Sequence, residues 1–204
     1  MRSKLYPLLT LSIFILITAC KEDDETVSPA DVITIEGIEY STVTIGTQTW
    51  TASNHAGAGG IRYDEVNSKP EYGKYYTYDE VKAFTLPEGW RIPAMEDYKT
   101  LAAAQGIVVP SHGTHTEGIK TITSTTNWKN TPGTNTTGFN ALPAGYSFNN
   151  SSPMDGDIAE FWTAEGNTMS IQEGANPNSL RILFYGGSSD AIYRFNVRFV
   201  KDNL

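Results

Sequence analysis

The chain has a single cysteine, Cys20, which separates two parts of the sequence with different physical properties. Before it, Arg2 and Lys4 are followed by an apolar run from Leu5 to Ile17. The 184 residues after it contain no further cysteine, so neither a disulfide nor a thiolate metal site can hold a domain together there. Such a domain has to be stabilised by packing, and its length suits one domain with a substantial core.

The first nineteen residues follow the plan of a secretory signal peptide, because positive charges precede an apolar run that ends in small residues. The run is shorter than the roughly 20 apolar residues that a transmembrane helix needs. The ending ITAC, residues 17–20, resembles a bacterial lipobox. That resemblance implies cleavage before Cys20, acylation of its thiol and a lipid anchor in the membrane. A plain secretory signal with an unused thiol is the alternative.

Residues 20–31 form a polar segment that begins CKEDDE. Its acids repel anionic lipid, so they do not draw the segment onto a membrane surface. They resemble the acidic signal of surface-exposed lipoproteins in Bacteroidota, which implies an outer-membrane lipoprotein exposed at the cell surface. A solvated spacer is the alternative. The segment has no apolar periodicity, and we expect a flexible tether.

The charge balance bears on the class of partner. Without residues 1–19, 13 basic residues remain against 23 acidic ones, which gives a net charge of −10 over 185 residues. A nucleic-acid partner would require a basic face, so none is expected. Direct binding of an acidic polysaccharide is disfavoured for the same reason, unless a cation mediates it.

The sequence from residue 32 onward changes to short β-rich runs. VITIEGIEYSTVTIGTQTW, residues 32–50, contains EG and GT as turn signals and predicts a hairpin. Strand signals return only in LRILFYG (180–186) and YRFNVRFV (193–200). Residues 111–157 are crowded with Gly, Asn, Ser and Thr, and are predicted to be long irregular loops.

Two helices are predicted, over residues 77–84 and 94–105. In the second, Met95, Tyr98 and Leu101 fall at helical spacing, acids stand in the first turn, and a glycine follows the last turn. Its apolar stripe should face the core. Together with the strands, these helices predict an α+β domain over residues 32–204.

Six blocks of sequence stand out in this part of the chain: IGTQTWTASN (45–54), EYGKYYTYDEVKAF (71–84), PEGWRIPAMEDYKTL (87–101), NTTGFNALPAGY (135–146), AEFWTA (159–164) and FNVRFVKD (195–202). They stand in the order found in the Fibrobacter succinogenes major paralogous domain family, and the chain resembles that family over about residues 32–202. The GWRIP block before a helix and the closing VRF also resemble the C-type-lectin-like fold. This implies a lectin-like domain with two helices, short antiparallel strands and long irregular loops.

Two departures from the family pattern fall at positions where members usually have cysteines. Leu86 and Phe199 occupy those positions here. Because both cysteines are absent together, we predict that an apolar contact replaces a disulfide and that Leu86 and Phe199 lie near each other. Thr51 and Ser53 also replace the Met and Glu that are common in the family.

Catalysis is not expected of this domain. The related formylglycine-generating enzymes use cysteine thiols, which the domain lacks. Its histidines are His55, His112 and His115. In SHGTHTEG, His112 and His115 with Glu117 would suit a metal only on a helix, and the glycines favour a solvated loop. A hydrolytic triad has no accompanying G-x-S-x-G elbow.

Calcium is the one cofactor for which the sequence offers candidate ligands. Calcium-dependent lectins carry an acidic triplet around a proline, and the nearest text here, NPN at 176–178, lacks the acid. Asp155, Asp157 and Glu160 in MDGDIAE supply oxygen ligands of the kind that Ca²⁺ prefers. The alternative is that MDGD forms an ordinary turn.

A binding surface is expected where Tyr and Asn gather in the irregular segments 146–157 and 172–190, since these residue types serve recognition. The four tryptophans lie in or near the family blocks and are expected in the core. Ordinary polar loops are the alternative. The candidate ligand-binding residues are Tyr146, Phe148, Asn149, Asn150, Asn176, Asn178, Tyr185 and Tyr193.

These observations predict a surface-anchored lipoprotein whose non-catalytic lectin-like domain binds an extracellular glycan or surface ligand. A structural or assembly component of a cell-surface protein complex is the alternative, and a hydrolase is a third. Glycan binding predicts exposed Tyr rings with polar side chains in a concavity. A protein partner predicts a contiguous apolar patch of several hundred Å².

Overall fold

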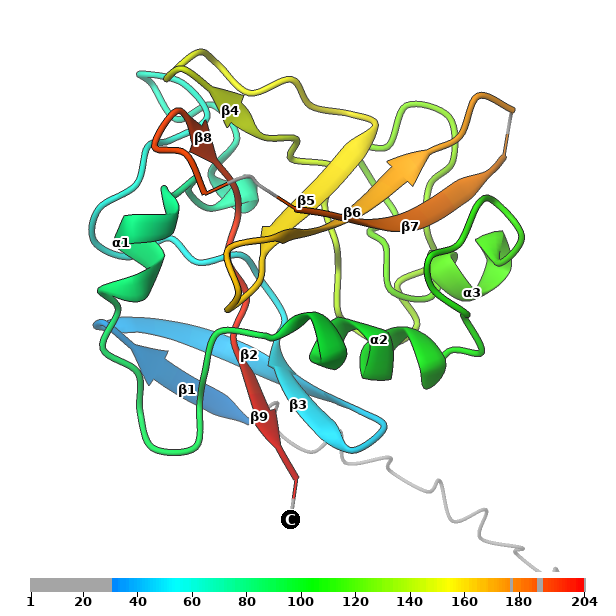
Figure 1. Ribbon diagram of the computed structural model, residues 1–204, viewed down its shortest axis with the longest axis horizontal. Coiled ribbons are helices and arrows are strands. Elements are labelled where there is room, and N and C mark those ends of the chain that lie inside the picture. The colour runs from blue at the N-terminus through cyan, green and yellow to red at the C-terminus, as the bar shows by residue number, and fades with distance from the viewer. Residues whose placement is uncertain (1–30, 177, 187–188, 204) are drawn as a thin grey trace, which may run out of the picture.

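The structure is a computed structural model that describes residues 31–176, 178–186 and 189–203 (Figure 1). The predicted signal peptide, Cys20 and the tether up to residue 30 lie outside these residues. None of the helices in the described part of the chain is long and apolar enough to cross a membrane. The elements form an α+β arrangement of antiparallel sheets and short helices, as predicted.

A four-stranded antiparallel sheet joins the two ends of the domain (Figure 1). Its strands are β1 (Val32–Ile35), β2 (Ile38–Ile45), β3 (Gln48–Thr51) and β9 (Val200–Asp202), in that order. The predicted hairpin is confirmed, and the turn between β1 and β2 has φ angles of 49° at Glu36 and 77° at Gly37. Trp50 pairs with Val200, so the closing strand completes the sheet that the first strands begin.

A three-stranded antiparallel sheet forms the opposite layer, with β5 (Ile158–Trp162), β6 (Thr168–Glu173) and β7 (Leu180–Tyr185). Two short strands, β4 (Ser147–Phe148) and β8 (Tyr193–Arg194), pair beside it. The prediction that strands return only at LRILFYG was wrong, because β5 and β6 precede it. The signal was present: TMSIQE in β6 alternates between polar and apolar residues, with Met169 and Ile171 in the core.

The two predicted helices are confirmed as α1 (Tyr78–Lys82) and α2 (Met95–Ala103). Thr77 and Glu80 form a capping box at the start of α1. In α2, Tyr98, Leu101 and Ala102 are buried, as the spacing predicts.

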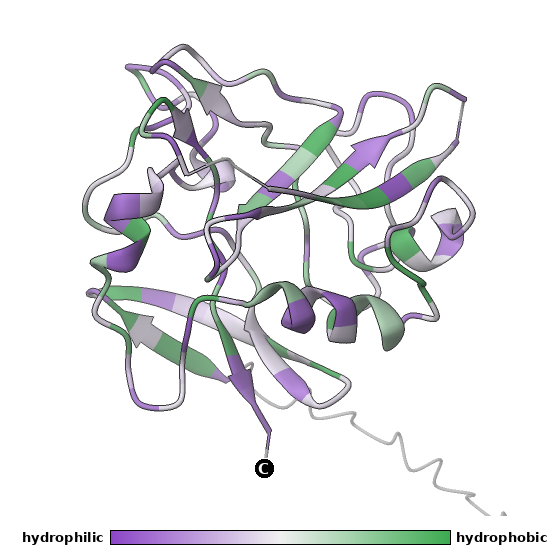
Figure 2. Ribbon diagram, viewed as in Figure 1, coloured by the Kyte–Doolittle hydropathy of each residue, from purple (hydrophilic) through white to green (hydrophobic). Residues whose placement is uncertain are grey.

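The prediction of two helices was incomplete. A short helix, α3 (Thr116–Lys120), follows the histidines in the segment expected to be a loop, and a 3₁₀ helix, η1 (Pro70–Tyr72), precedes α1. Figure 2 shows hydrophilic and hydrophobic residues on both α1 and α2, as expected of helices with one face on a core.

The main core lies between α2, β3 and the inner face of the three-stranded sheet. Trp50, Trp128 and Trp162 are buried and Trp90 is half-buried, so the tryptophans lie in or against the core as predicted. A second cluster contains Phe199, and Leu86 packs against that cluster. This shared cluster agrees with the prediction that these two residues lie near each other.

Residues 195–199 run as an extended segment between the layers. Phe195, Val197 and Phe199 pack into the second cluster, while Arg198 points to the opposite side and is fully buried. Burial lowers the pKa of Arg198 to about 9, and no acid pairs with it among the described residues. Its guanidinium instead donates to Asn54 Oδ1 and to the carbonyls of Thr51, Phe139 and Asn140. This segment therefore joins loops that are far apart in the sequence.

Candidate functional site

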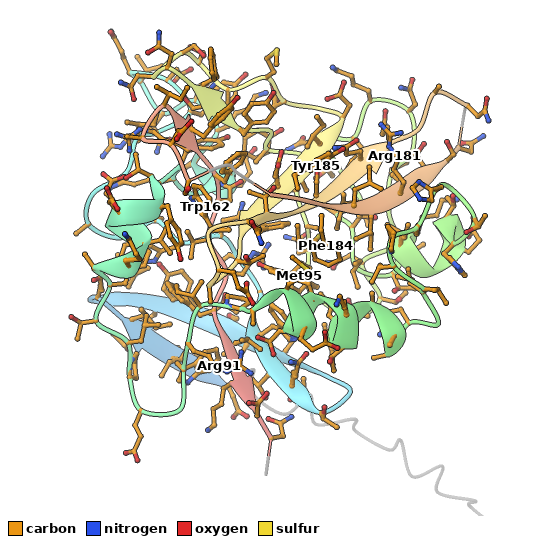
Figure 3. The ribbon with its side chains drawn as sticks, viewed as in Figure 1. Arg91, Met95, Trp162, Arg181, Phe184 and Tyr185 are labelled. Atoms are coloured by element: carbon orange, nitrogen blue, oxygen red, sulfur yellow. The ribbon has the colours of Figure 1, made fainter. Side chains whose placement is uncertain are left out.

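The outer face of the three-stranded sheet carries polar side chains, although the inner face belongs to the core. The register places Ile158, Gln172 and Arg181 in one row, and Trp162, Thr168 and Tyr185 in another. Figure 3 shows Tyr185 and Arg181 on the side of β7 away from α2, with Phe184 on the side toward α2. Trp162 and Thr168 on this face are fully buried. Only the part around Ile158, Gln172 and Tyr185 is therefore available to build a site.

A concavity of about 380 Å³ lies over this face. Side chains from the sheet and from the segments beside β4 and β8 line it. The lining residues are Tyr146, Ile158, Glu160, Gln172, Tyr185, Gly186, Tyr193 and Phe195. Pockets that hold small ligands have volumes of about 300–1,000 Å³ and carry a few polar groups among aromatic walls, which is the composition seen here.

Glu160 is the most unusual group in the concavity, because it is an acid with only 6% of its surface exposed. Its Oε1 atom accepts a hydrogen bond of 2.6 Å from Thr168 Oγ1. Burial raises the pKa of Glu160 from 4.5 to about 7, and the bond from Thr168 offsets only part of this rise. A buried acid with a strongly shifted pKa in a concavity is a recognised mark of a functional site.

Aromatic rings form one wall of the concavity. The ring centroids of Tyr146 and Tyr193 are 6.4 Å apart, and Phe195 lies 5.5 Å from Tyr146 and 6.0 Å from Tyr193. These separations are typical of packed aromatic clusters, in which each ring limits the motion of the next. The wall is therefore preorganised.

The opposite wall is held by a hydrogen-bond network across β6 and β7. Gln172 Nε2 donates to the hydroxyl of Tyr185 over 3.0 Å, and Gln172 Oε1 accepts from the guanidinium of Arg181 over 2.9 Å. The amide orientation of Gln172 is thus fixed from both ends. Tyr185 remains 40% exposed, so its ring is accessible from solvent.

A glycine places Tyr146 in the site. Gly145 has φ of +67°, and a Cβ atom there would lie 1.7 Å from the carbonyl oxygen of Met154. The Gly145 amide donates to the Ile158 carbonyl over 2.7 Å, which draws the chain against β5. Because another residue at 145 would clash with backbone, the close approach that sets Tyr146 beside Glu160 depends on glycine.

The structure brings together only some of the predicted ligand-binding residues. Tyr146, Tyr185 and Tyr193 line the concavity, and Phe148 packs on Tyr193 with ring centroids 5.2 Å apart. Asn149 and Asn150 follow β4, where the Oδ1 atom of Asn150 accepts from Arg194 and its side chain lines a different hollow.

Asn176 and Asn178 do not join the tyrosines. They lie in the turn between β6 and β7, while Tyr185 pairs with Thr168 at the other end of that hairpin. Neither residue lines the concavity, which reaches this end of the hairpin only as far as Ile158 and Gln172.

The predicted calcium ligands have three different sets of partners. Asp155 accepts from Tyr63, Lys69 and Tyr72, Asp157 pairs with Lys129, and Glu160 faces the concavity. Burial alone would raise the pKa of Asp155, but the hydrogen bonds from Lys69 and the two tyrosines hold it below its ordinary value. Within the described residues no three His, Cys, Asp or Glu side chains are grouped to hold a metal ion, His112, His115 and Glu117 included.

His55 belongs to the core. It is fully buried among aromatic rings, and its Nδ1 atom lies 2.8 Å from the Tyr40 hydroxyl. Burial lowers the pKa of His55 to about 4, and the nearby Glu36 only partly opposes this shift. At neutral pH it is therefore an uncharged packing residue.

A larger hollow of about 570 Å³ lies between residues 61–65 and 150–152. Exposed and half-buried loop residues line it, and none of them is a buried acid or base. The smaller concavity around Glu160 is the better candidate, because it combines aromatic walls with a buried acid.

Comparison with protein families matches residues 43–201 to the Fibrobacter succinogenes major domain. The chain belongs to this family. No curated protein and no solved structure matches the chain.

The structure explains what one block of the Fibrobacter succinogenes major domain does in this chain. In the GWRIP block, Arg91 pairs with Asp97 at the start of α2 and with Asp202 of β9. Gln48 of β3 also donates to Asp97, over 2.7 Å. The motif therefore fixes α2 to the four-stranded sheet and does not reach the concavity.

Sequence reasoning did not assign the carboxylate and the amide of the concavity to ligand binding. Glu160 was considered only as a calcium ligand, and Gln172 was not singled out within its segment. The alternation in TMSIQE would have found Gln172, because it places this residue on the face opposite to the core side chains. IAEFW has no such alternation, since the apolar Ile158 and Trp162 share the face of Glu160, and only the pairing of β5 with β6 brings Glu160 to this face.

Proposed function

We propose that this domain binds an extracellular glycan at the concavity around Glu160, without catalysis, in a lipoprotein anchored through Cys20. The observation that carries the proposal is the convergence of Tyr146, Tyr185 and Tyr193 on Glu160 and Gln172 in an open hollow. Sugars present apolar faces that pack on rings and hydroxyls that bond to carboxylate and amide groups. The concavity offers both kinds of contact.

A C-type-lectin-like fold is part of the proposal. Two features support it: β9 pairs with the strands that open the domain, and helices and a second sheet lie between them in the sequence. The binding face that the lectin resemblance implies, in the irregular segments beyond the helices, includes Tyr146 of this concavity.

The position of the concavity suits an anchored protein. Figure 1 places the four-stranded sheet, where the described chain begins, on the side of the molecule opposite to the outer face of β5, β6 and β7. A tether that enters at Asp31 would attach on the side of the domain remote from the concavity and would leave the concavity unobstructed. Cell-surface exposure and the lipid anchor are proposals that rest on the N-terminal sequence.

The assembly alternative has weaker support. Phe148 and Ile192 are 46% and 42% exposed and lie together, since the Asn149 amide donates to the Ile192 carbonyl. Two such side chains fall short of the several hundred Å² of contiguous apolar surface that mark a docking site.

The test is a glycan array probed with the full chain in nonionic detergent. We expect binding that is lost in Tyr185→Ala and retained in Tyr185→Phe, which keeps the ring and removes only the hydroxyl. Val66→Ala is the surface control, because Val66 is 82% exposed and lies outside the concavity. A blank array for the folded protein would refute glycan binding and favour a protein partner.

A further inference from the structure

The concavity contains an acid whose charge, when it ionises, the protein itself does not balance. Glu160 Oε1 bonds to Thr168, and Glu160 Oε2 has no hydrogen-bond partner within the part of the chain that the structure describes. The basic side chains of the surrounding elements have other partners: Arg181 bonds to Gln172, Arg194 to Glu80 and Asn150, and Lys129 to Asp157.

An unbalanced buried carboxylate is unfavourable, and a cation at this position would offset that cost. The raised pKa of Glu160 reflects this cost, because burial disfavours the charged form. A neutral ligand would remove water from the carboxylate without supplying a counter-charge. A ligand cation would supply one, and the net charge of −8 on the chain would also attract it.

The rest of the lining suits one kind of cation. Tyr146, Tyr185 and Tyr193 present aromatic rings, and the faces of such rings attract ammonium groups. A Ca²⁺ ion takes about six to eight oxygen ligands, and one carboxylate and one amide supply too few of them. Rings around a single acid fit an organic ammonium group, whose methyl or methylene carbons pack on the rings while its charge meets the acid.

We propose that the concavity binds an alkylammonium group, held between the rings of Tyr146, Tyr185 and Tyr193 and the carboxylate of Glu160. This inference rests on the proposed function in that it specifies the ligand of the same concavity: the preferred glycan carries a protonated or quaternary amine. The site recognises the ammonium group of the ligand, and the carboxylate of Glu160 selects this group over a neutral group of the same shape.

The test compares choline with 3,3-dimethyl-1-butanol, which has the same shape and no charge. Both are titrated by NMR into the full chain in nonionic detergent at pH 8, where Glu160 is ionised. We expect choline to bind at least tenfold more tightly. Glu160→Gln should reduce this preference to less than twofold, while Glu39→Gln, which removes an exposed acid on β2, should leave it unchanged.

A second pair of variants tests the rings without changing the acid. Tyr185→Leu should weaken choline binding at least threefold, and Tyr185→Phe by less than twofold, because the phenyl ring keeps its π face. Equal affinities for choline and its neutral analogue, or a preference that survives Glu160→Gln, would overturn the inference.

The source of the ammonium group is resolved by a third probe, the 2-aminoethyl glycoside of glucose. Tighter binding of this glycoside than of choline assigns the group to a saccharide, and tighter binding of choline assigns it to a headgroup of choline type. Neutral glycans bound on the array with no choline preference would overturn the inference and leave the glycan proposal intact. Choline binding together with a blank array would refute the glycan proposal and leave the ammonium site intact.

Discussion

Replacing Glu160 with glutamine should stabilise the free protein in a pH-dependent manner. The side chain is 6% exposed, and its pKa is about 7 in the folded state against 4.5 ordinarily. The folded state therefore holds the proton more tightly than the unfolded state does. This contribution to stability is fully present below pH 4.5 and is lost as the pH rises to about 7.

The magnitude follows from the pKa shift. A difference of about 2.5 pKa units, at 1.36 kcal/mol for each unit, corresponds to about 3 kcal/mol. Glutamine has nearly the same shape and its oxygen can still accept the hydrogen bond from Thr168, but it carries no charge at any pH. The stability difference between Glu160→Gln and wild type should therefore grow by about 3 kcal/mol between pH 4.5 and pH 8, in favour of the variant.

Urea unfolding followed by tryptophan fluorescence measures this difference, because Trp50 and Trp162 are fully buried. The other titrating groups are shared by the two proteins and cancel in the comparison. Glu39→Gln should show no such trend. A difference that stays constant from pH 4.5 to pH 8 would refute the burial of an uncompensated acid, and with it the physical basis of the site.

Four further predictions test other parts of the protein. Arg198→Met should lower the free energy of unfolding by about 3–5 kcal/mol in urea titrations, because its acceptors would stay buried without a donor; full stability of Arg198→Lys would contradict this. Asp155→Asn should cost about 1–3 kcal/mol and Asp157→Asn less, since the pair that Asp157 makes is half-exposed. The pKa of about 4 at His55 predicts that wild type loses stability as the pH falls from 6.5 to 4, and that His55→Phe loses less in acid unfolding. Cys20→Ser should release the protein from the membrane fraction on cell fractionation, and retention there would contradict lipidation.

Local sequence signals predicted several elements correctly. The helices α1 and α2 follow from a capping box and from apolar spacing, both of which act within a few residues. The first hairpin follows from β-rich runs joined by tight turns. The family blocks identified the family, because six motifs in order carry more information than any one of them.

Other elements were mispredicted for reasons that are also local. Polar residues such as Ser170 and Gln172 made β6 resemble a loop, although they alternate with core residues. The short helix α3 begins next to His115 in a glycine-containing segment, where intrinsic propensity is low. Its buried Ile119 packs in the main core, so tertiary packing stabilises a turn of helix that the segment alone does not favour.

The sequence by itself determined the residue types available for recognition, the α+β class and an N-terminal segment with the features of a lipid-anchor signal. Only the tertiary structure decided which candidates meet. Tyr146, Tyr185 and Tyr193 come from distant segments, and they converge because β5, β6 and β7 pair in one register while Gly145 draws the chain onto β5. The same packing covers most of Glu160, and no local pattern encodes that burial, since it depends on residues such as Tyr146 and Phe195 that the fold brings over this face.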